Sequence, residues 1–132
     1  MNNEILEQEV LTGKKILIAD DDPVNQYVLN QMLKKFGIAS DFVVNGVEAI
    51  EKLKQGQYDL ILMDIQMPEM NGWEAARKIR SDLHSNIPII AITAFVAADA
   101  AIMIGEAGMN DFISKPFTID VLRMTITKAL LK

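Results

Sequence analysis

Four short apolar runs, each followed by a side chain that can take part in chemistry, constrain this chain more than any other feature. The runs span residues 16–19, 60–63, 89–92 and 112–114, and the polar residues that follow or end them are Asp20, Asp64, Thr93 and Lys115. Runs of this length, bounded by turn signals, are typical of strands buried on both faces. Ligands of open parallel sheets bind beyond the carboxyl ends of the strands. The sequence therefore predicts that carboxylates, a hydroxyl and an ammonium group meet at one edge.

Strand and helix patterns alternate along the chain from residue 14 onward. We expect strands at 15–19, 39–44, 58–63, 88–92 and 110–113, and helices at 23–36, 45–53, 73–80, 96–107 and from 118 to about 131. Asp22 is the expected N-cap of the first of these helices, with Pro23 in its first turn. Strict alternation implies right-handed crossovers, which predicts an α/β fold with a doubly wound parallel sheet and helices on both faces.

Apolar residues at helical spacing predict which side of each helix faces the sheet. In the helix at 23–36 the expected core residues are Val28, Leu29, Met32, Leu33 and Phe36. In the helix at 45–53 they are Val47, Ile50 and Leu53.

Length and composition limit the possible classes of protein. The chain has 132 residues, no cysteine and a net charge of −5, so one domain at 14–132 is expected, without disulfide bonds. There is no dense basic cluster for direct nucleic-acid binding and no apolar stretch near the about 20 residues of a membrane span. A cytoplasmic location fits these properties. Residues 1–13 are an arm or linker for which a helix, a linker remnant and a disordered segment all remain open.

Three carboxylates, those of Asp20, Asp21 and Asp64, are expected to converge at the predicted edge. Their mutual repulsion requires a cation or a shifted pKa, and oxygen ligands of this kind suit Mg²⁺. Asp64 is then the natural nucleophile, because a carboxylate can form an acyl phosphate. Lys115 and Thr93 supply a positive charge and a hydroxyl group. Such a site suits phosphoryl transfer, which depends mainly on positioning and charge neutralisation.

These motifs, taken in order, resemble the signature of the response-regulator receiver domain. The resemblance covers residues 14–132 and rests on the sets Asp20-Asp21, Met63-Asp64, Met67-Pro-Glu-Met-Asn-Gly72, Thr93-Ala94 and Lys115-Pro116. It implies a CheY-like, flavodoxin-like (βα)₅ fold with strand order 2-1-3-4-5. It also implies a phosphoprotein of two-component signal transduction or a phosphorelay, which is a phosphoacceptor and not a turnover enzyme.

The resemblance further implies a role for each metal-site residue. Asp64 accepts a phosphoryl group from a phosphohistidine on a histidine kinase or histidine phosphotransfer protein. Asp21, Asp64 and the backbone carbonyl of Gln66 ligate Mg²⁺, and Asp20 holds a water molecule of the metal.

Thr93 and Lys115, by the same resemblance, contact the phosphoryl oxygens. Phe112 occupies the position of the switch aromatic residue and turns inward as Thr93 moves toward the phosphate. The surface formed by the fourth helix, fifth strand and fifth helix is expected to change on phosphorylation, and a homodimer through it is one expected assembly.

Several residues refine or depart from the family pattern. Phe112 replaces the tyrosine often found there, which removes a hydroxyl group. We expect the bulky Phe95 to restrict water and slow hydrolysis of the acyl phosphate. Gln66 and the run Pro23-Val-Asn-Gln26 resemble receivers of hybrid sensor kinases. The sequence leaves open whether the Lys115–Pro116 bond is cis, although proline makes the cis form accessible.

Two apolar surfaces have more than one interpretation. The helix at 96–107 has little polar face, which indicates either a partner surface or simply the high helix propensity of alanine. Val24 and Tyr27 lie off the predicted core stripe, so they are either partner contacts or ordinary exposed apolar residues. His84 lies in a polar loop and is expected to be solvated.

Two other functions use similar residues. A haloacid-dehalogenase-type phosphatase also uses an aspartyl phosphate, Mg²⁺ and a lysine, but it places a second Asp two residues after the nucleophile, where this chain has Gln66. A receiver-like scaffold that acts without phosphorylation is the other alternative, and the complete set of site residues argues against it.

Overall fold

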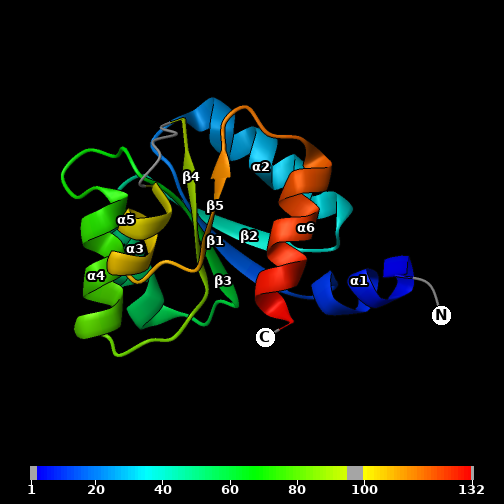
Figure 1. Ribbon diagram of the computed structural model, residues 1–132, viewed down its shortest axis with the longest axis horizontal. Coiled ribbons are helices and arrows are strands. Elements are labelled where there is room, and N and C mark those ends of the chain that lie inside the picture. The colour runs from blue at the N-terminus through cyan, green and yellow to red at the C-terminus, as the bar shows by residue number, and fades with distance from the viewer. Residues whose placement is uncertain (1–2, 95–99, 132) are drawn as a thin grey trace.

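Five parallel strands form one sheet in the order β2-β1-β3-β4-β5 in the computed structural model, which describes residues 3–94 and 100–131 (Figure 1). This confirms the expected fold class and strand order. The strands are β1 (Lys15–Ala19), β2 (Ala39–Val43), β3 (Leu60–Asp64), β4 (Ile89–Thr93) and β5 (Asp111–Ser114). The helices are α1 (Asn3–Leu11), α2 (Pro23–Lys35), α3 (Gly46–Gln55), α4 (Gly72–Ser81), α5 (Ala100–Glu106) and α6 (Ile119–Leu130).

The sheet is buried because helices cover both of its faces. α3, α4 and α5 lie on one side and α2 and α6 on the other (Figure 1). Alternate residues of β1 point to opposite faces: Leu17 packs in the cluster with Ala75 and Ile79 of α4, while Ile16 packs with Leu33 of α2. Each uninterrupted apolar run of the sequence therefore contributes side chains to the hydrophobic core on both faces of the sheet.

Polar caps set the start of most helices close to the expected positions. Asp22 accepts a hydrogen bond from the backbone of Val24 at 2.9 Å, and Pro23 follows in the first turn of α2. Asn45, Asn71 and Thr118 cap α3, α4 and α6 in the same way. Each side-chain oxygen satisfies a backbone N–H that has no partner within the helix.

The prediction of a core position is wrong for two residues. Val28 and Val47 are 41% and 42% exposed. In α2 the sheet is covered by Leu29 and Leu33, and Val28 lies one residue further round the helix. In α3 the small residue Ala49 is fully buried instead. The expected core residues Ile50 and Leu53 do pack against the cluster that contains Ala49 and Ala75, so the inner face of α3 lies beside Val47 and not on it.

Residues 3–11 form a helix, which is one of the alternatives left open for the N-terminal arm. Leu11, at the end of α1, is only 2% exposed and packs in the cluster formed with α2 and α6. The Glu7 carboxylate lies 3.1 Å from Nε of Arg123 in α6. Among the described residues, no helix combines the length and apolar character needed to cross a membrane.

The described part of the expected helix at 96–107 is α5. Its buried residues are Ile104 and, just beyond its end, Ala107, whereas Ile102 is exposed. The positive φ of Gly108 (83°) ends the helix, and Arg80 of α4 donates a hydrogen bond to the Gly108 carbonyl at 2.9 Å. This bond ties the C-terminal end of α5 to α4. The first expected residues of the helix, and Phe95 before it, lie outside the described residues.

Candidate functional site

The sheet edge at the carboxyl ends of the strands gathers the expected carboxylates. Asp20 follows β1 directly, Asp21 is next to it, and Asp64 is the last residue of the neighbouring β3. One oxygen from each of these three side chains lies within 4.8 Å of the others. The parallel register brings Asp20 and Asp64 to the same end of two adjacent strands, although they are far apart in sequence.

Asp20 is the most buried of the three, with 1% of its surface exposed. Its Oδ1 accepts a hydrogen bond from the Asp22 backbone at 2.9 Å. Its Oδ2 is buried and has no hydrogen-bond partner among the described residues. Burial is the main cause that raises the pKa of Asp20; the Asp22 N–H acts in the opposite direction, and the charge of Asp64 adds to the rise. The charge of Lys115 lowers the pKa, but it does not outweigh the effect of burial.

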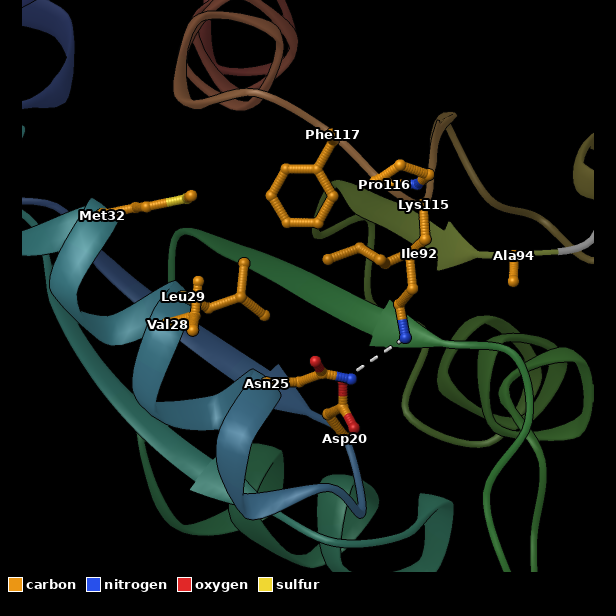
Figure 2. Close-up of a pocket in the computed structure, with 10 residues that line it drawn as sticks. All are labelled: Asp20, Asn25, Val28, Leu29, Met32, Ile92, Ala94, Lys115, Pro116 and Phe117. Atoms are coloured by element: carbon orange, nitrogen blue, oxygen red, sulfur yellow. Dashed lines mark ion pairs between the residues drawn. The ribbon is translucent and has the colours of Figure 1, made fainter.

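Lys115 reaches this carboxylate cluster from the loop after β5. Its Nζ lies 3.5 Å from Asp64 Oδ2 and 3.9 Å from Asp20 Oδ2. Figure 2 shows the lysine side chain extending toward Asp20. The Lys115–Pro116 peptide bond, which the sequence left open, is cis. The ammonium group is close enough to attract both carboxylates without forming a short contact with either.

The loop that follows Asp64 lines an open cavity beside the site. The Asp64 side chain is 12% exposed, and its Oδ1 accepts a hydrogen bond from the Gln66 backbone at 3.1 Å. A cavity of about 470 Å³ lies on one side of the site and one of about 610 Å³ on the other. Asp21, Gln66 and Trp73 line the larger cavity. The larger cavity therefore leaves open space beside Asp21 and the Gln66 segment.

Thr93 and Phe112, the two expected switch residues, lie on the adjacent strands β4 and β5. Thr93 is buried and pairs in register with Ser114, whereas Phe112 pairs with Ala91. Phe112 is half-buried and packs against the apolar cluster on the α3–α5 side. Because side chains alternate along a strand, Thr93 and Phe112 belong to the same face of the sheet, two positions apart.

The smaller cavity is a groove between α2 and the loop after β5 (Figure 2). Its lining is mainly apolar, with Met32 on one wall and Phe117 on the other, and Asn25, Asp20 and Lys115 at the end nearest the site. The sequence assigned Met32 to the core and did not single out Asn25 or Phe117. The available signal was the position of Phe117 directly after the Lys-Pro pair.

The residues at the edge fit a hard divalent cation. All three side chains offer oxygen ligands, Mg²⁺ favours one or two carboxylates together with water and phosphoryl oxygens, and Asp20 Oδ2 is a buried acceptor without a hydrogen bond. The Gln66 carbonyl belongs to the segment that lines the same cavity as Asp21. The donor set therefore fits Mg²⁺ better than a metal that prefers nitrogen or sulfur.

Comparison with known proteins gives the same picture. The family model of the response regulator receiver domain matches residues 16–127. The chain is 42% identical over 130 residues to hybrid signal transduction histidine kinase B of Dictyostelium discoideum, a match that covers 89% of this chain and 7% of that protein. It is 37% identical over 124 residues to the sensor protein EvgS of Escherichia coli K12, covering 92% of this chain and 10% of that protein.

Solved structures of receiver domains are similarly close. The receiver domain of the sensor histidine kinase PA1611 from Pseudomonas aeruginosa PAO1, which has a magnesium ion in its active-site cleft, is 34% identical, with a TM-score of 0.83. The match covers 92% of this chain and 100% of that domain. The response regulator TrrA of Thermotoga maritima, solved with Mg²⁺ and BeF, is 33% identical with a TM-score of 0.78, covering 88% and 98% of the two chains.

The chain spans about a tenth or less of the curated relatives described above. Receivers are phosphoacceptor switch domains of two-component systems. The family match over most of the chain, the fold and the kinase relatives agree. The chain therefore belongs to the response regulator receiver domain family, as a receiver of the hybrid histidine kinase type.

Proposed function

We propose that this receiver takes a phosphoryl group from a phosphohistidine of a partner protein onto Asp64, with Mg²⁺ bound at the adjacent carboxylates. The observation that carries the proposal is the position of Asp64. It is the one member of the three-carboxylate cluster that is paired with Lys115 at 3.5 Å, partly open to solvent, and placed at the end of the central strand β3.

The transfer follows from this geometry. A carboxylate oxygen of Asp64 donates an electron pair to phosphorus and forms the new P–O bond. The P–N bond to the donor imidazole breaks, and its electron pair returns to the ring nitrogen. Lys115 stabilises negative charge on the phosphoryl oxygens, and the buried Thr93 at the end of β4 supplies a hydroxyl group. No general acid is needed on this side of the reaction.

Bound Mg²⁺ would supply further charge neutralisation at the phosphoryl oxygens. We assign Asp21, Asp64 and the backbone carbonyl of Gln66 as its ligands, with Asp20 acting through a water molecule. The burial of Asp20 and its unbonded Oδ2 support this arrangement, because a buried carboxylate gains most from a nearby cation.

The receiver then acts as a switch. Phosphorylation draws Thr93 toward the new charge, and Phe112 follows on the same face of the sheet, which alters the surface formed by α5, β5 and α6. Exposed Ile102, Val121 and Met124 on the two helices give this surface apolar contacts. A homodimer through that surface is the assembly we propose to follow phosphorylation.

The partner is a histidine kinase or a histidine phosphotransfer protein, and it docks on α2 of the receiver. Val24 and Tyr27 are 67% and 65% exposed and lie on the helix that borders the groove beside Lys115. An apolar surface next to the acceptor fits a partner that must bring its histidine to Asp64. Direct nucleic-acid binding is not part of this proposal.

Turnover of small phosphate esters is not part of it either. The position two residues after Asp64 holds Gln66, whose amide cannot act as the general acid that a haloacid-dehalogenase-type phosphatase requires. A phosphorylation-independent scaffold would respond to neither Mg²⁺ nor a phosphoryl analogue, which separates that alternative from ours.

The experiment adds acetyl phosphate or beryllofluoride to the protein with Mg²⁺ and follows Trp73 fluorescence, because Trp73 lines the cavity shared with Asp21 and Gln66. We expect a saturable change that Asp64→Asn abolishes and that the exposed control Asp82→Asn retains. Tyr27→Ala should slow transfer from a phosphohistidine protein far more than phosphorylation by acetyl phosphate. An unchanged spectrum with the parent protein would support the scaffold, and steady release of phosphate from a free ester would support the phosphatase.

A further inference from the structure

The connection between β2 and α3 touches both chain segments that carry the proposed metal ligands. The Val43 carbonyl accepts a hydrogen bond from the Asp20 backbone at 3.0 Å. Three residues later, the Gly46 N–H donates to the Met70 carbonyl at 3.0 Å. Residues 43–46 therefore join the Asp20–Asp21 segment to the loop that follows Gln66, although none of their side chains belongs to the carboxylate cluster.

Gly46 leaves no space at the second of these contacts. A Cβ atom at this position would lie 2.8 Å from the Met70 carbonyl oxygen, 2.8 Å from Met70 Cγ and 2.9 Å from Ala75 Cβ. Contacts below 3.0 Å are essentially never found for real Cβ atoms. The Met70 side chain is flexible, but its backbone oxygen cannot retreat unless the loop moves. Glycine is therefore needed here for close approach, and not for an unusual backbone angle.

The connection itself is held firmly. Asn45 is buried, and its Oδ1 accepts a hydrogen bond from the Glu48 backbone at 2.8 Å. In return, Glu48 Oε1 accepts from the Val44 backbone at 3.2 Å. This reciprocal pair satisfies backbone donors on both sides of Gly46. The contact of Gly46 with Met70 is thus made from a segment that these hydrogen bonds hold in place.

The loop on the other side depends more on its neighbours. Glu69 has a φ of 64°, which is unusual for a residue other than glycine. The Gly72 N–H bonds to the Ile65 carbonyl at 2.9 Å, which closes the loop at its base. Between these points, the Met70 carbonyl accepts the hydrogen bond from Gly46 of α3. The direction of the Gln66 carbonyl is then sensitive to where Met70 is held.

We propose that Gly46 is a positioning residue of the receiver site, which sets the spacing between the Asp20–Asp21 segment and the Gln66 loop. This inference rests on the proposed function, because it concerns the same Mg²⁺ site. Mg²⁺ tolerates little departure from octahedral geometry, so a shift of the loop carbonyl relative to Asp21 weakens binding even if the fold is intact.

The test compares Mg²⁺ affinity in the full chain, measured by Trp73 fluorescence, with thermal stability measured separately. Gly46→Ala should weaken Mg²⁺ binding by about 10-fold, the size found when groups that orient metal ligands are lost. The matched control is Gly105→Ala in α5, since a Cβ there meets nothing within 4 Å. Its Mg²⁺ affinity should equal that of the parent.

A second pair of variants covers the case in which Gly46→Ala does not fold. Asn45→Ala removes the cap that holds the connection and should also weaken Mg²⁺ binding, whereas Asn45→Ser retains a capping oxygen and should restore it. Folded variants with lower thermal stability but parental Mg²⁺ affinity would overturn the proposal. If the parent itself fails to bind Mg²⁺, the proposed function is what fails.

Discussion

Burial gives neighbouring residues of one type different properties. Asp20 is 1% exposed, Asp64 is partly open and Asp21 is exposed, although their oxygens lie within 4.8 Å of one another. Burial disfavours the charged form of Asp20, so the pKa of its carboxyl group rises. Asp64, the acceptor that we propose, is partly open to solvent. The same type of side chain thus suits the proposed metal binding at one position and the proposed phosphoryl acceptance at another.

A second cluster of polar residues, far from the site in the fold, stabilises the opposite end of the sheet. The Tyr58 hydroxyl donates a hydrogen bond to Asp41 Oδ2 at 2.7 Å, and Lys15 Nζ lies 3.3 Å from the same oxygen. Burial, followed by this bond, raises the pKa of Tyr58 to about 12. The hydrogen bond from Tyr58 is the main cause that lowers the pKa of Asp41.

Tyr58→Phe should lower the free energy of unfolding at pH 7 by about 1 kcal/mol, because the bond to a carboxylate is lost at a half-exposed position. The lowered pKa of Asp41 means that the folded state binds fewer protons than the unfolded chain near pH 3.8, so the contribution disappears as the pH falls through the lowered value. Because the pKa of Tyr58 is raised, the stabilising contribution of this hydrogen bond is also lost as the pH rises from 10 toward about 12.

Urea unfolding across this pH range measures the loss of the Tyr58 contribution at low pH and at high pH. The matched control is Tyr27→Phe, because Tyr27 is 65% exposed and should change stability by less than about 0.5 kcal/mol. A Tyr58→Phe penalty that stays constant from pH 3 to pH 12 would contradict the assigned hydrogen bond.

At the scale of elements, local signals explain where strands and helices begin, and contacts explain where they pack. Asp22, Asn45, Asn71 and Thr118 cap their helices through oxygens only two or three residues away from the N–H groups they accept from. Such signals are local and can be recognised in a sequence. The docking of α1 on α6 depends instead on Leu11 fitting a cluster formed by distant segments.

Leu11→Ala should lower the free energy of unfolding by about 3 kcal/mol, since it removes a fully buried side chain and leaves a cavity. Urea denaturation measures the loss, and Glu9→Ala on the exposed side of the same helix is the control. If both variants unfold at the parental urea concentration, α1 does not contribute to the stability of the domain.

At the scale of the whole molecule, the parallel sheet concentrates negative charge that the fold alone does not neutralise. The carboxylates of two adjacent strands converge, and Lys115 contributes one positive charge at 3.5 Å and 3.9 Å. A cation that binds only the folded state raises stability in proportion to the logarithm of its concentration. Metal binding and folding are therefore coupled.

Mg²⁺ should raise the free energy of unfolding by about 2.7 kcal/mol at 100 times its dissociation constant. Asp21→Asn should remove most of that gain, because it deletes a proposed ligand and also relieves part of the repulsion. Thermal unfolding with MgCl₂, against NaCl of equal ionic strength, measures the difference. An equal gain in the parent and in Asp21→Asn would show that the metal binds elsewhere.

By itself, the sequence determined the number of strands, their parallel arrangement and the residues at their ends. Short apolar runs, the helical period of 3.6 residues and caps within three residues are local signals. Asp20, Asp64, Thr93 and Lys115 could therefore be placed at one edge in advance. The resemblance to receivers supplied the strand order, which the structure confirms.

Only the tertiary structure decided the inner faces of α2 and α3, the docking of α1, the cis Lys115–Pro116 bond and the contact of Gly46 with Met70. Each of these depends on how closely segments distant in the sequence approach one another. A hydrophobic pattern favours a core position for Val47, but in the fold Ala49 is fully buried and Val47 is exposed. Close packing is a property of pairs of elements, and no single stretch of sequence contains it.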